Sequence, residues 1–352
     1  MRRPEFAMSN AEAREFLAAQ STFTLAGVAA DGAPVLRTLH GVLVDDHLVF
    51  HSSPKGEKTS LLGQPVVAAC EELVATVPST FFDPVKACPA TTYYRSVQVH
   101  GVAQEITDPA RKARALQALM EKLQPQGGHR AITHDDPMYR AQVGGLLVAG
   151  LPLTQLTGKA KLAQNRKPQD IPTLLEQLWR RGDPGDVRAL ELVRAANPLA
   201  PSPAFLTGPH GCTLHAWLPA SDAPRVATLL EGTYWNEGIS PARLVRAHVC
   251  SAAWVGARDP DGALIGSARA TSDATKWAWL YDVIVAPAWR RRKVAQAMVS
   301  LLLDHPAVRD TARVMLATRD AQEVYRPLGF VEKDARPRAI PSIEMVLVRE
   351  PA

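Results

Sequence analysis

Apolar and polar residues alternate through much of the amino-terminal half of the chain, as they do in half-buried β-strands. The alternation is clearest over residues 23–50, where the pairs Asp31-Gly32 and Asp45-Asp46 interrupt it as turn signals. Further strands are expected over residues 65–74, 94–106 and 143–153, and helices over residues 11–19, 109–123 and 170–181. The first part of the chain is therefore predicted to be a mainly β domain covered by a few helices.

A stretch rich in proline and glycine, residues 195–211, separates this region from one with a different pattern. In the second region, strand and helix signals follow one another closely. Strands are expected over residues 252–257, 264–271, 277–285, 313–317 and 344–348, and helices over residues 223–230, 241–247, 291–304 and 321–328. This order predicts an α/β sheet with helices packed against it.

The length of 352 residues also favours two domains over one. We place them at residues 8–198 and 209–352, with the boundary in the proline- and glycine-rich stretch. Residues 1–7 precede a second methionine, Met8, and read as a vector-derived leader, so they are left out of the fold prediction.

Composition narrows the class of protein. Hydrophobic residues make up 46% and charged residues 21% of the chain, as in soluble globular proteins. No apolar run is long enough to span a bilayer and no signal peptide is evident, so we expect a cytoplasmic protein without a membrane partner. The four cysteines lack the spacing of a zinc site or of a disulfide framework, so no metal site is expected.

The net charge is +5, but the basic residues are dispersed apart from one cluster, Arg-Arg-Arg-Lys at residues 290–293. An anionic cofactor explains so short a cluster better than nucleic acid does. In the surrounding segment, LYDVIVAPAWRRRKVAQA, a buried strand runs through a proline-containing turn into a helix. The N–H groups and the dipole at the start of that helix suit a diphosphate, and a solvated basic surface is the alternative.

This strand, turn and helix resemble motif A of the GNAT acetyltransferase superfamily, [Arg/Gln]-x-x-Gly-x-[Gly/Ala]. Its six positions are filled by Arg290, Arg291, Arg292, Lys293, Val294 and Ala295. Residues 316–330, which end in Val-Tyr-Arg-Pro-Leu-Gly-Phe, resemble motif B, and residues 234–238 and 266–273 resemble one GNAT subgroup. The resemblance covers residues 210–350 and implies an α/β acyltransferase fold that uses acetyl-CoA.

The same resemblance implies roles for single residues. Tyr325 matches the general acid that protonates the departing CoA thiolate, and Asp282 is the candidate base, acting directly or through water. A packed core tyrosine and a structural hydrogen bond are the respective alternatives. The backbone of Val283 and Val285 is expected to pair with the pantetheine amides, and Thr318 stands where the family often has asparagine.

One position departs from the motif, because Lys293 replaces the glycine at which the backbone approaches the pyrophosphate. Its side chain would either crowd CoA or add a charge to the CoA phosphates. We therefore expect lysine at position 293 to affect CoA binding more than the fold.

In the amino-terminal domain, basic and hydroxyl side chains gather at the end of one predicted strand and just after another. Arg37, Ser52, Ser53 and Lys58 supply the charges and hydroxyls that a phosphate needs where no long helix points at it. A polar hairpin loop at the surface is the alternative.

The run His-x-x-x-Lys-Gly-x-Lys from His51 to Lys58, together with residues 93–103, is similar to the split-barrel superfamily that includes pyridoxamine 5′-phosphate oxidase and the nitroimidazole-resistance proteins. The resemblance covers residues 10–165 and implies a flavin domain. Members of this superfamily dimerise with the flavin at the interface, so a homodimer is expected. Some members bind no flavin or bind haem instead.

Carried over by position, this resemblance assigns the FMN phosphate to Arg37, Ser53 and Lys58. Thr38, His51 and Ser96 would lie near the ribityl chain or the ring of FMN. The redox chemistry belongs to the flavin, so none of these residues identifies a substrate.

We therefore expect a two-domain α+β protein, with an FMN-binding split β-barrel followed by a GNAT acyltransferase. The expected function is bifunctional and directed at small molecules: a flavin-dependent oxidoreductase, for nitro-compound reduction or amine oxidation, fused to an acetyl-CoA-dependent N-acetyltransferase. Two alternatives stay open, namely a flavin- or CoA-sensing protein with little turnover and a haem-binding barrel.

Overall fold

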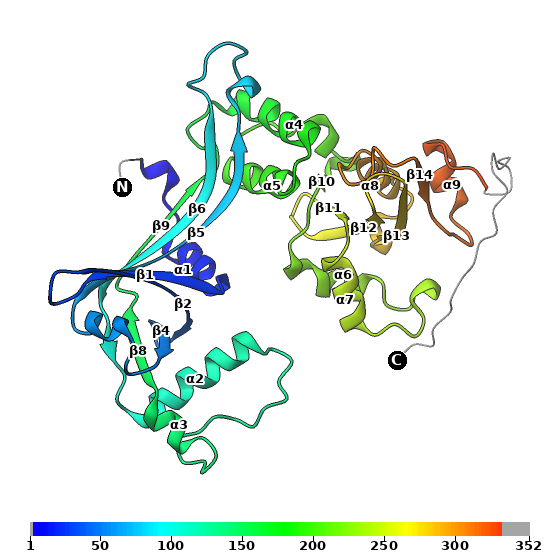
Figure 1. Ribbon diagram of the computed structural model, residues 1–352. Helices are drawn as coiled ribbons and strands as arrows, with labels where there is room; N and C mark the ends of the chain where they lie inside the picture. Colours follow the sequence, from blue (N-terminus) through cyan, green and yellow to red (C-terminus); the bar gives the residue numbers. More distant parts are fainter. Residues whose placement is uncertain (1–2, 333–352) are drawn as a thin grey trace. The chain divides into compact units, whose positions relative to one another are not determined.

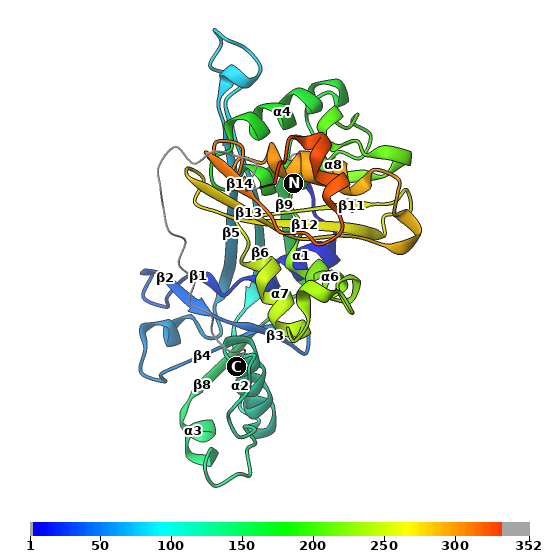
Figure 2. The ribbon, with the colours of Figure 1, turned by 90° about the vertical axis from the view of Figure 1, so that its right-hand side faces the viewer.

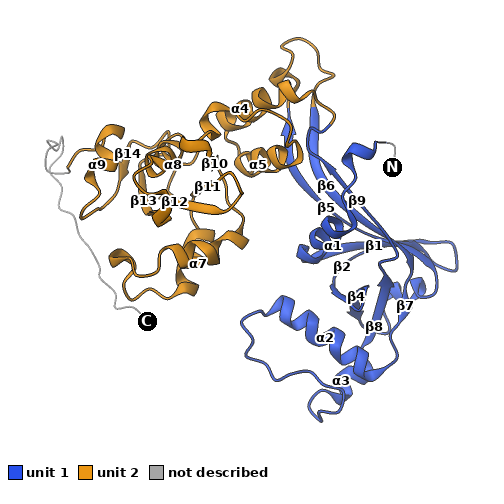
Figure 3. Cartoon of the chain, turned by 180° about the vertical axis from the view of Figure 1, so that it is seen from behind, with its two compact units in different colours: residues 1–77, 91–164 blue, residues 78–90, 165–352 orange. Residues whose placement is uncertain are grey.

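The computed structural model describes residues 3–332 and divides the chain into two compact units. The first unit is made of residues 1–77 and 91–164, and the second of residues 78–90 and 165–352 (Figure 3). The tip of one hairpin and the chain after residue 164 thus belong with the carboxy-terminal unit. The expected division at 8–198 and 209–352 is a different one, and it stays a prediction.

Two antiparallel sheets build the first unit (Figure 1). The strand order is β2-β1-β5-β6-β9 in the larger sheet and β3-β4-β8-β7 in the smaller. The strands are β1 (Thr22–Val28), β2 (Pro34–His40), β3 (Val42–Val44), β4 (His47–Ser52), β5 (Pro65–Val77), β6 (Thr91–Val102), β7 (Gln104–Glu105), β8 (Leu147–Pro152) and β9 (Gln155–Lys161). The helices are α1 (Asn10–Ala19), α2 (Pro109–Leu123) and α3 (Arg140–Gly145).

Local sequence signals account for the first hairpins and the first helix. Asp45 and Asp46, with φ of 48° and 57°, form the turn between β3 and β4, since aspartate tolerates the left-handed region better than most residues. Gly32, with φ of 86°, turns the chain between β1 and β2. Ser9 and Glu12 form a capping box at the start of α1. The predicted β-meander and amino-terminal helix are confirmed.

The core of the first unit lies between the two sheets, where buried residues such as Leu25 and Val99 of the larger sheet gather with Leu48 and Leu151 of the smaller. The opposite face of the smaller sheet is covered by α2, which packs against Val49 and Val148. Side chains alternate along a strand, so His51 of β4 shares the α2 face with Val49.

The described part of the second unit contains one sheet of order β10-β11-β12-β13-β14, and among these strands only β13 and β14 are parallel. Its strands are β10 (Thr213–His215), β11 (Ala253–Arg258), β12 (Leu264–Ser272), β13 (Trp277–Val285) and β14 (Arg313–Met315). Its helices are α4 (Ile171–Arg181), α5 (Asp186–Ala196), α6 (Ala223–Leu229), α7 (Pro241–Val249), α8 (Val294–Leu303) and α9 (Gln322–Tyr325).

Helices cover both faces of this sheet (Figure 2). On one face Met298 of α8 packs over Gly266, where an added Cβ would lie 2.7 Å from the methionine Cε. On the other face α6 and α7 enclose Trp254 and Ile284 in a separate apolar cluster. Strand β13 thus contacts α8 and, at Asp282, the segment that links α6 to α7.

The helical pair α4 and α5 is tied to the same unit by polar contacts. Trp179 Nε1 donates to Asp304 Oδ2 at 2.6 Å, at the end of α8. Arg194 Nη1 donates to the carbonyl of Leu214 in β10 at 2.8 Å. These bonds explain why the chain after residue 164 clusters with the carboxy-terminal sheet.

Several expected elements differ from the structure. Residues 143–145, the start of one expected strand, belong to α3, and only Gln322–Tyr325 of the expected helix 321–328 is α-helical. The edge strand β9 and the helix α5 were not expected. The expected strand at 344–348 lies outside the described residues. Within residues 3–332, no helix is both long and apolar enough to cross a membrane.

Candidate functional site

The parallel strands β13 and β14 are paired only at their first three positions, from Trp277 with Arg313 to Trp279 with Met315. Strand β13 then continues to Val285, whereas β14 ends at Met315. Among the described strands, the second half of β13 therefore has a ladder partner on one side only. Such a splay between parallel strands leaves backbone N–H and C=O groups available to an extended ligand.

A β-bulge lies at this point of β13. The register between β12 and β13 shifts between Ser267 and Arg269, and Asp282 takes a left-handed φ of 51°. The Asp282 carboxylate is 6% exposed and receives two hydrogen bonds, from Arg269 Nε at 2.6 Å and from Asn236 Nδ2 at 3.0 Å. Both oxygens of the candidate base are thus engaged, which favours the structural hydrogen bond that is the alternative to a catalytic role.

The two valines expected to bind pantetheine differ in their surroundings. Val283 lies within the bulge, between the paired positions Tyr281 and Ile284. Val285 is paired with Gly266 in β12, and its carbonyl accepts a hydrogen bond from Arg290 Nε at 3.1 Å. Of the two, Val283 has the backbone that is better placed to pair with a ligand.

The loop after β13 leads into α8 through two left-handed residues other than glycine. Arg291 has φ of 60°, and Lys293, the residue before the first turn of α8, has φ of 62° and ψ of 11°. The backbone therefore takes, at Lys293, the conformation that glycine adopts most easily, which accounts for the glycine of the motif.

The start of α8 offers free backbone donors. The first bond of the helix runs from the N–H of Ala297 to the carbonyl of Lys293, at 3.0 Å, and Lys293 provides no side-chain cap. The N–H groups of Val294 and Ala295 have no intrahelical partner. The side chains of Arg291, Arg292 and Lys293 are exposed around this helix start, and Arg292 lies over the Trp289 ring at 5.1 Å. Backbone and side chains together suit a diphosphate.

Tyr325 ends the short helix α9 and is half-buried, with its ring 5.8 Å from that of Phe330. Burial raises the pKa of its phenol, and Tyr234 adds to the effect. The phenol is therefore protonated at neutral pH and able to donate. Nearby, Thr318 Oγ1 accepts from the N–H of Ala321 at 3.0 Å and so holds the turn before α9.

In the first unit, the two predicted FMN contacts of β2, Arg37 for the phosphate and Thr38 for the ribityl chain or ring, lie on different faces of the strand. Arg37 shares the face of Val35 and Leu39, while Thr38 points to the other side of β2. The Arg37 guanidinium is exposed and forms an ion pair with Glu57, in the 3-10 turn Glu57–Leu61. A phosphate bound at Arg37 would have to compete with this carboxylate.

His51 lies beside His40, with ring centroids 5.1 Å apart. Burial lowers the pKa of His51, and the charges of His40 and Lys58 lower it further. His51 Nδ1 is buried and makes no hydrogen bond to any described residue. His40, His51 and Lys58 therefore form one group that combines the basic side chain of Lys58 with an unpaired nitrogen of His51.

The other predicted flavin contacts are less favourably placed. Ser52 is buried and its hydroxyl donates to the carbonyl of Ser53 at 3.0 Å, while Ser53 Oγ accepts from the N–H of Lys55 at 3.3 Å. Ser96 lies in β6, which is separated from β2 by β1 and β5. Within a single chain, Ser96 is therefore not next to Arg37 of β2, one of the predicted phosphate ligands.

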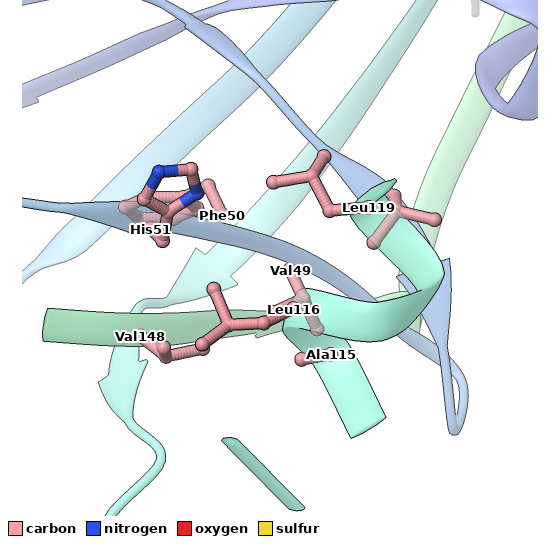
Figure 4. A pocket seen from close by; sticks show the side chains of 8 residues that line it. Val49, Phe50, His51, Ala115, Leu116, Leu119 and Val148 are labelled. Atoms are coloured by element: carbon pink, nitrogen blue, oxygen red, sulfur yellow. The ribbon is translucent and has the colours of Figure 1, made fainter. Parts of the chain in front are cut away.

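Figure 4 shows the seam next to His51, where side chains from β4, β8 and α2 meet. Apart from His51, all its lining residues are apolar, and it holds no space for a ligand. The seam is part of the core, so a flavin ring would have to lie elsewhere around His51.

Sequence reasoning did not single out Asn236 or Arg269, although both fall within the segments that resemble the GNAT subgroup. Their contacts with Asp282 join a 3-10 turn, β12 and β13. Residue spacing carries no signal for such an arrangement, but a buried aspartate in a strand does call for partners of this kind.

Comparison with known proteins divides the chain in two. Residues 9–160 match the model of the family described as Pyridoxamine 5′-phosphate oxidase, and residues 223–330 match that of the Acetyltransferase (GNAT) family. The chain therefore joins a pyridoxamine 5′-phosphate oxidase-like split-barrel domain to a GNAT domain. No curated protein matches the chain.

Solved structures similar to each part include the flavocytochrome Anf3 from Azotobacter vinelandii, at 21% identity and a TM-score of 0.38, covering 44% of this chain and 69% of that one. A 5-nitroimidazole antibiotic resistance protein from Bacteroides thetaiotaomicron is 18% identical with a TM-score of 0.35, over 44% and 85% of the two chains. A GNAT-family acetyltransferase from Xanthomonas campestris is 28% identical with a TM-score of 0.32, over 38% and 96%.

We expect Lys293→Gly to raise the free energy of unfolding of the carboxy-terminal unit by about 0.5–1 kcal/mol. Relief of the left-handed conformation, roughly 1–2 kcal/mol, exceeds the added entropy of glycine in the unfolded chain. Urea denaturation followed by tryptophan fluorescence measures the change. Arg292→Gly is the control, since it removes the same charge at a position whose φ is not left-handed, and it should destabilise instead. Equal effects of the two substitutions would contradict the strain argument.

Proposed function

We propose that the carboxy-terminal unit is an N-acyltransferase that transfers an acetyl group from acetyl-CoA to a small-molecule amine. The observation that carries this proposal is the start of α8, where free N–H groups and three exposed basic side chains follow directly on the splayed end of β13. CoA is an extended molecule with a diphosphate, so it fits a backbone slot that ends at an anion-binding helix start.

In this proposal the helix start and residues 290–293 hold the diphosphate, and Val283 pairs with the pantetheine amide. The amine nitrogen attacks the thioester carbonyl, and the thiolate of CoA leaves. Tyr325 donates its phenolic proton to that thiolate, since the raised pKa keeps the phenol protonated at neutral pH. Asp282 orients the site through Arg269 and Asn236.

A CoA-sensing protein with little turnover is the second candidate, and Lys293 in place of the motif glycine favours it. Titration calorimetry with CoA, together with thiol release from acetyl-CoA in the presence of primary amines, separates the two functions. CoA binding without thiol release for any amine supports sensing, and the absence of binding overturns both.

We expect Tyr325→Phe to lower kcat for thiol release about 100-fold, because the thiolate loses its proton donor. The Kd for CoA should not change, since the phenol acts only as the thiolate leaves. Calorimetry and a thiol-release assay measure the two quantities. Tyr139→Phe, at a half-buried tyrosine of the other unit, is the control and should leave kcat unchanged. A kcat of Tyr325→Phe close to that of the wild type would show that Tyr325 is not the general acid.

We also propose that the amino-terminal unit binds a flavin and acts as an oxidoreductase. The resemblance to the split-barrel superfamily indicates that this flavin is FMN. The support is the group of His40, His51 and Lys58, which joins the positive charge of Lys58 to a buried imidazole nitrogen without a hydrogen-bond partner among the described residues. A bound flavin would supply the redox chemistry, while these residues hold its phosphate and polar edge. An absorption spectrum separates this proposal from its alternative, since a Soret band would indicate a haem-binding barrel.

Replacement of Glu57 tests whether the FMN phosphate binds at Arg37. Glu57→Gln should tighten FMN binding several-fold, because Arg37 no longer shares its charge with a carboxylate. Quenching of FMN fluorescence on titration with the protein measures the Kd. Asp46→Asn is the matched control, since it breaks the exposed Arg14–Asp46 ion pair of the same unit and should not alter binding. An unchanged or weaker Kd for Glu57→Gln would place the phosphate away from Arg37.

We further propose that the amino-terminal unit forms a homodimer through the outer face of its larger sheet. Leu36, Ala26 and Val67 lie in one row across β2, β1 and β5, and Leu36 is 62% exposed. Val28, two residues along β1 on the same face, is 57% exposed. A second copy would cover this apolar face, and it could supply Ser96 to the flavin site of its partner.

Leu36→Asp should convert the dimer to a monomer, because it introduces a charge into the apolar row. Sedimentation velocity gives the mass of the species. Leu123→Asp, at the exposed end of α2, is the control and should leave the dimer intact. A wild-type protein that sediments as a monomer at micromolar concentration would end this proposal.

A further inference from the structure

Three aromatic side chains lie on one face of β13. Side chains alternate along a strand, so Trp277, Trp279 and Tyr281 point to the same side of the sheet. We call these three residues the aromatic row. Tyr281 is paired with Arg269 of β12, and Arg269 with Trp254 of β11, which packs against α6 and α7. The aromatic row therefore shares the face of α6 and α7, yet Trp277 stays 44% and Tyr281 39% exposed.

A hollow of about 330 Å³ lies beside the aromatic row. Its walls come from the hairpin of β12 and β13, with Trp277 and Trp279 on one strand and Thr271, the cross-strand partner of Trp279, on the other. Such a volume suits a small molecule. Asp273 also lines the hollow, but its Oδ1 accepts hydrogen bonds from the N–H groups of residues 275–277 and so holds the hairpin turn.

Guanidinium groups already lie over two rings of the aromatic row. Arg313 Cζ is 5.0 Å from the centroid of the Trp277 ring, and Arg269 Cζ is 4.8 Å from that of Tyr281. Trp279 lies between these two rings and is nearly parallel to Tyr281, at 6.1 Å and 25°. A cation at Trp279 would be repelled from both sides, whereas a neutral planar ring can stack there.

The aromatic row ends at the proposed site of acyl transfer. Tyr281 directly precedes Asp282, and the guanidinium over the Tyr281 ring also donates to Asp282 Oδ2 at 2.6 Å. Val283, whose backbone is proposed to pair with pantetheine, follows two residues after Tyr281, roughly 7 Å of extended strand. A ring stacked at this end of the row can therefore present an attached nitrogen to the thioester.

The state of Asp282 restricts which nitrogen can react there. An alkylamine is an ammonium ion at pH 7 and has to give a proton to a base before it attacks. Asp282 is poorly suited to that task, since Oδ1 accepts from Asn236 and Oδ2 from Arg269. A nitrogen attached directly to an aromatic ring shares its lone pair with the ring and is unprotonated at pH 7. Such an amine needs no base before the attack.

We propose that the acceptor of the acyltransferase is an aromatic amine, with its nitrogen attached directly to a ring that stacks on Trp279 and Tyr281. This inference rests on the proposed acyltransferase function and names the substrate class of that site. Two independent observations carry it: the exposed aromatic row with guanidinium groups over its outer rings, and the carboxylate that is engaged on both oxygens.

The proton balance of the reaction is complete without a further base. The nitrogen lone pair forms the N–C bond to the thioester carbonyl, and the C–S bond breaks with its electron pair on sulfur. Tyr325 gives its phenolic proton to the thiolate. The proton that the nitrogen loses as it becomes an amide returns the phenolate of Tyr325 to a phenol.

The substrate class is tested by thiol release from acetyl-CoA with three amines of similar size at pH 7. Aniline has a flat ring and an unprotonated nitrogen, benzylamine has a flat ring and an ammonium group, and cyclohexylamine has neither feature of aniline. We expect kcat/KM to be highest for aniline and lowest for cyclohexylamine. A higher kcat/KM for benzylamine than for aniline would show that the site deprotonates an ammonium, and it would overturn the assignment.

Replacement of Trp279 tests the stacking. Trp279→Leu should lower kcat/KM for aniline on the order of 10-fold more than for cyclohexylamine, because only the flat ring loses a stacking partner. Trp279→Phe keeps a ring and should restore most of the preference. A merely structural role of Trp279 would affect both amines equally. If circular dichroism shows that Trp279→Leu is unfolded, Trp277→Leu takes its place.

Trp217→Leu is the matched control. Trp217 is a half-buried tryptophan just beyond β10, at the opposite edge of the described sheet from β14, and Arg188 lies over its ring at 5.7 Å. The preference for aniline over cyclohexylamine should be that of the wild type. An unchanged preference in Trp279→Leu, or none in the wild type, would overturn the inference and leave the acyltransferase function standing.

Binding to the aromatic row is measurable without turnover, by ¹⁹F NMR of the full chain labelled with 5-fluorotryptophan. Trp277→Phe and Trp279→Phe assign the two resonances. We expect both to shift in a saturable way with aniline, while the resonance of Trp179, which is buried and bonded to Asp304, stays in place. Unshifted resonances of the row would overturn the inference. Failure of the wild type to release thiol with any primary amine would instead overturn the acyltransferase function.

Discussion

The carboxy-terminal site depends on the buried ion pair between Arg269 and Asp282. A bulge turns Asp282 out of the regular ladder at the cost of a left-handed φ, and the carboxylate then bonds to side chains from β12 and from the turn at Asn236. Because it is almost fully buried, loss of either partner would leave an uncompensated charge. The pair thus fixes the shape of β13 close to where it separates from β14.

A second strained element follows a few residues later, at the start of α8. Arg291 and Lys293 hold left-handed conformations that glycine would adopt without strain, and their side chains extend into solvent beside the free N–H groups. The bulge and this loop bracket the second half of β13. Backbone strain at both ends of one short segment is typical of a ligand site.

The amino-terminal unit poses a different problem, because its sheet register spreads the predicted flavin residues. Arg37 and Thr38 point to opposite faces of β2, and Ser96 lies three strands away in the same sheet. What one chain does assemble is the group of His40, His51 and Lys58, together with an apolar row across three strands. A site completed by a second copy would reconcile the two observations.

The sequence by itself determined the features that rest on neighbouring residues: the turns at Asp31-Gly32 and Asp45-Asp46, the alternation of the meander, and the strand, turn and basic helix start around residue 290. It missed α5, which lies between turn signals, although Ala189, Leu190 and Val193 show helical spacing and are buried. Only the tertiary structure decided that Asn236, Arg269 and Asp282 meet. These residues come from three different elements, and their meeting depends on sheet register and on one bulge, neither of which local patterns specify.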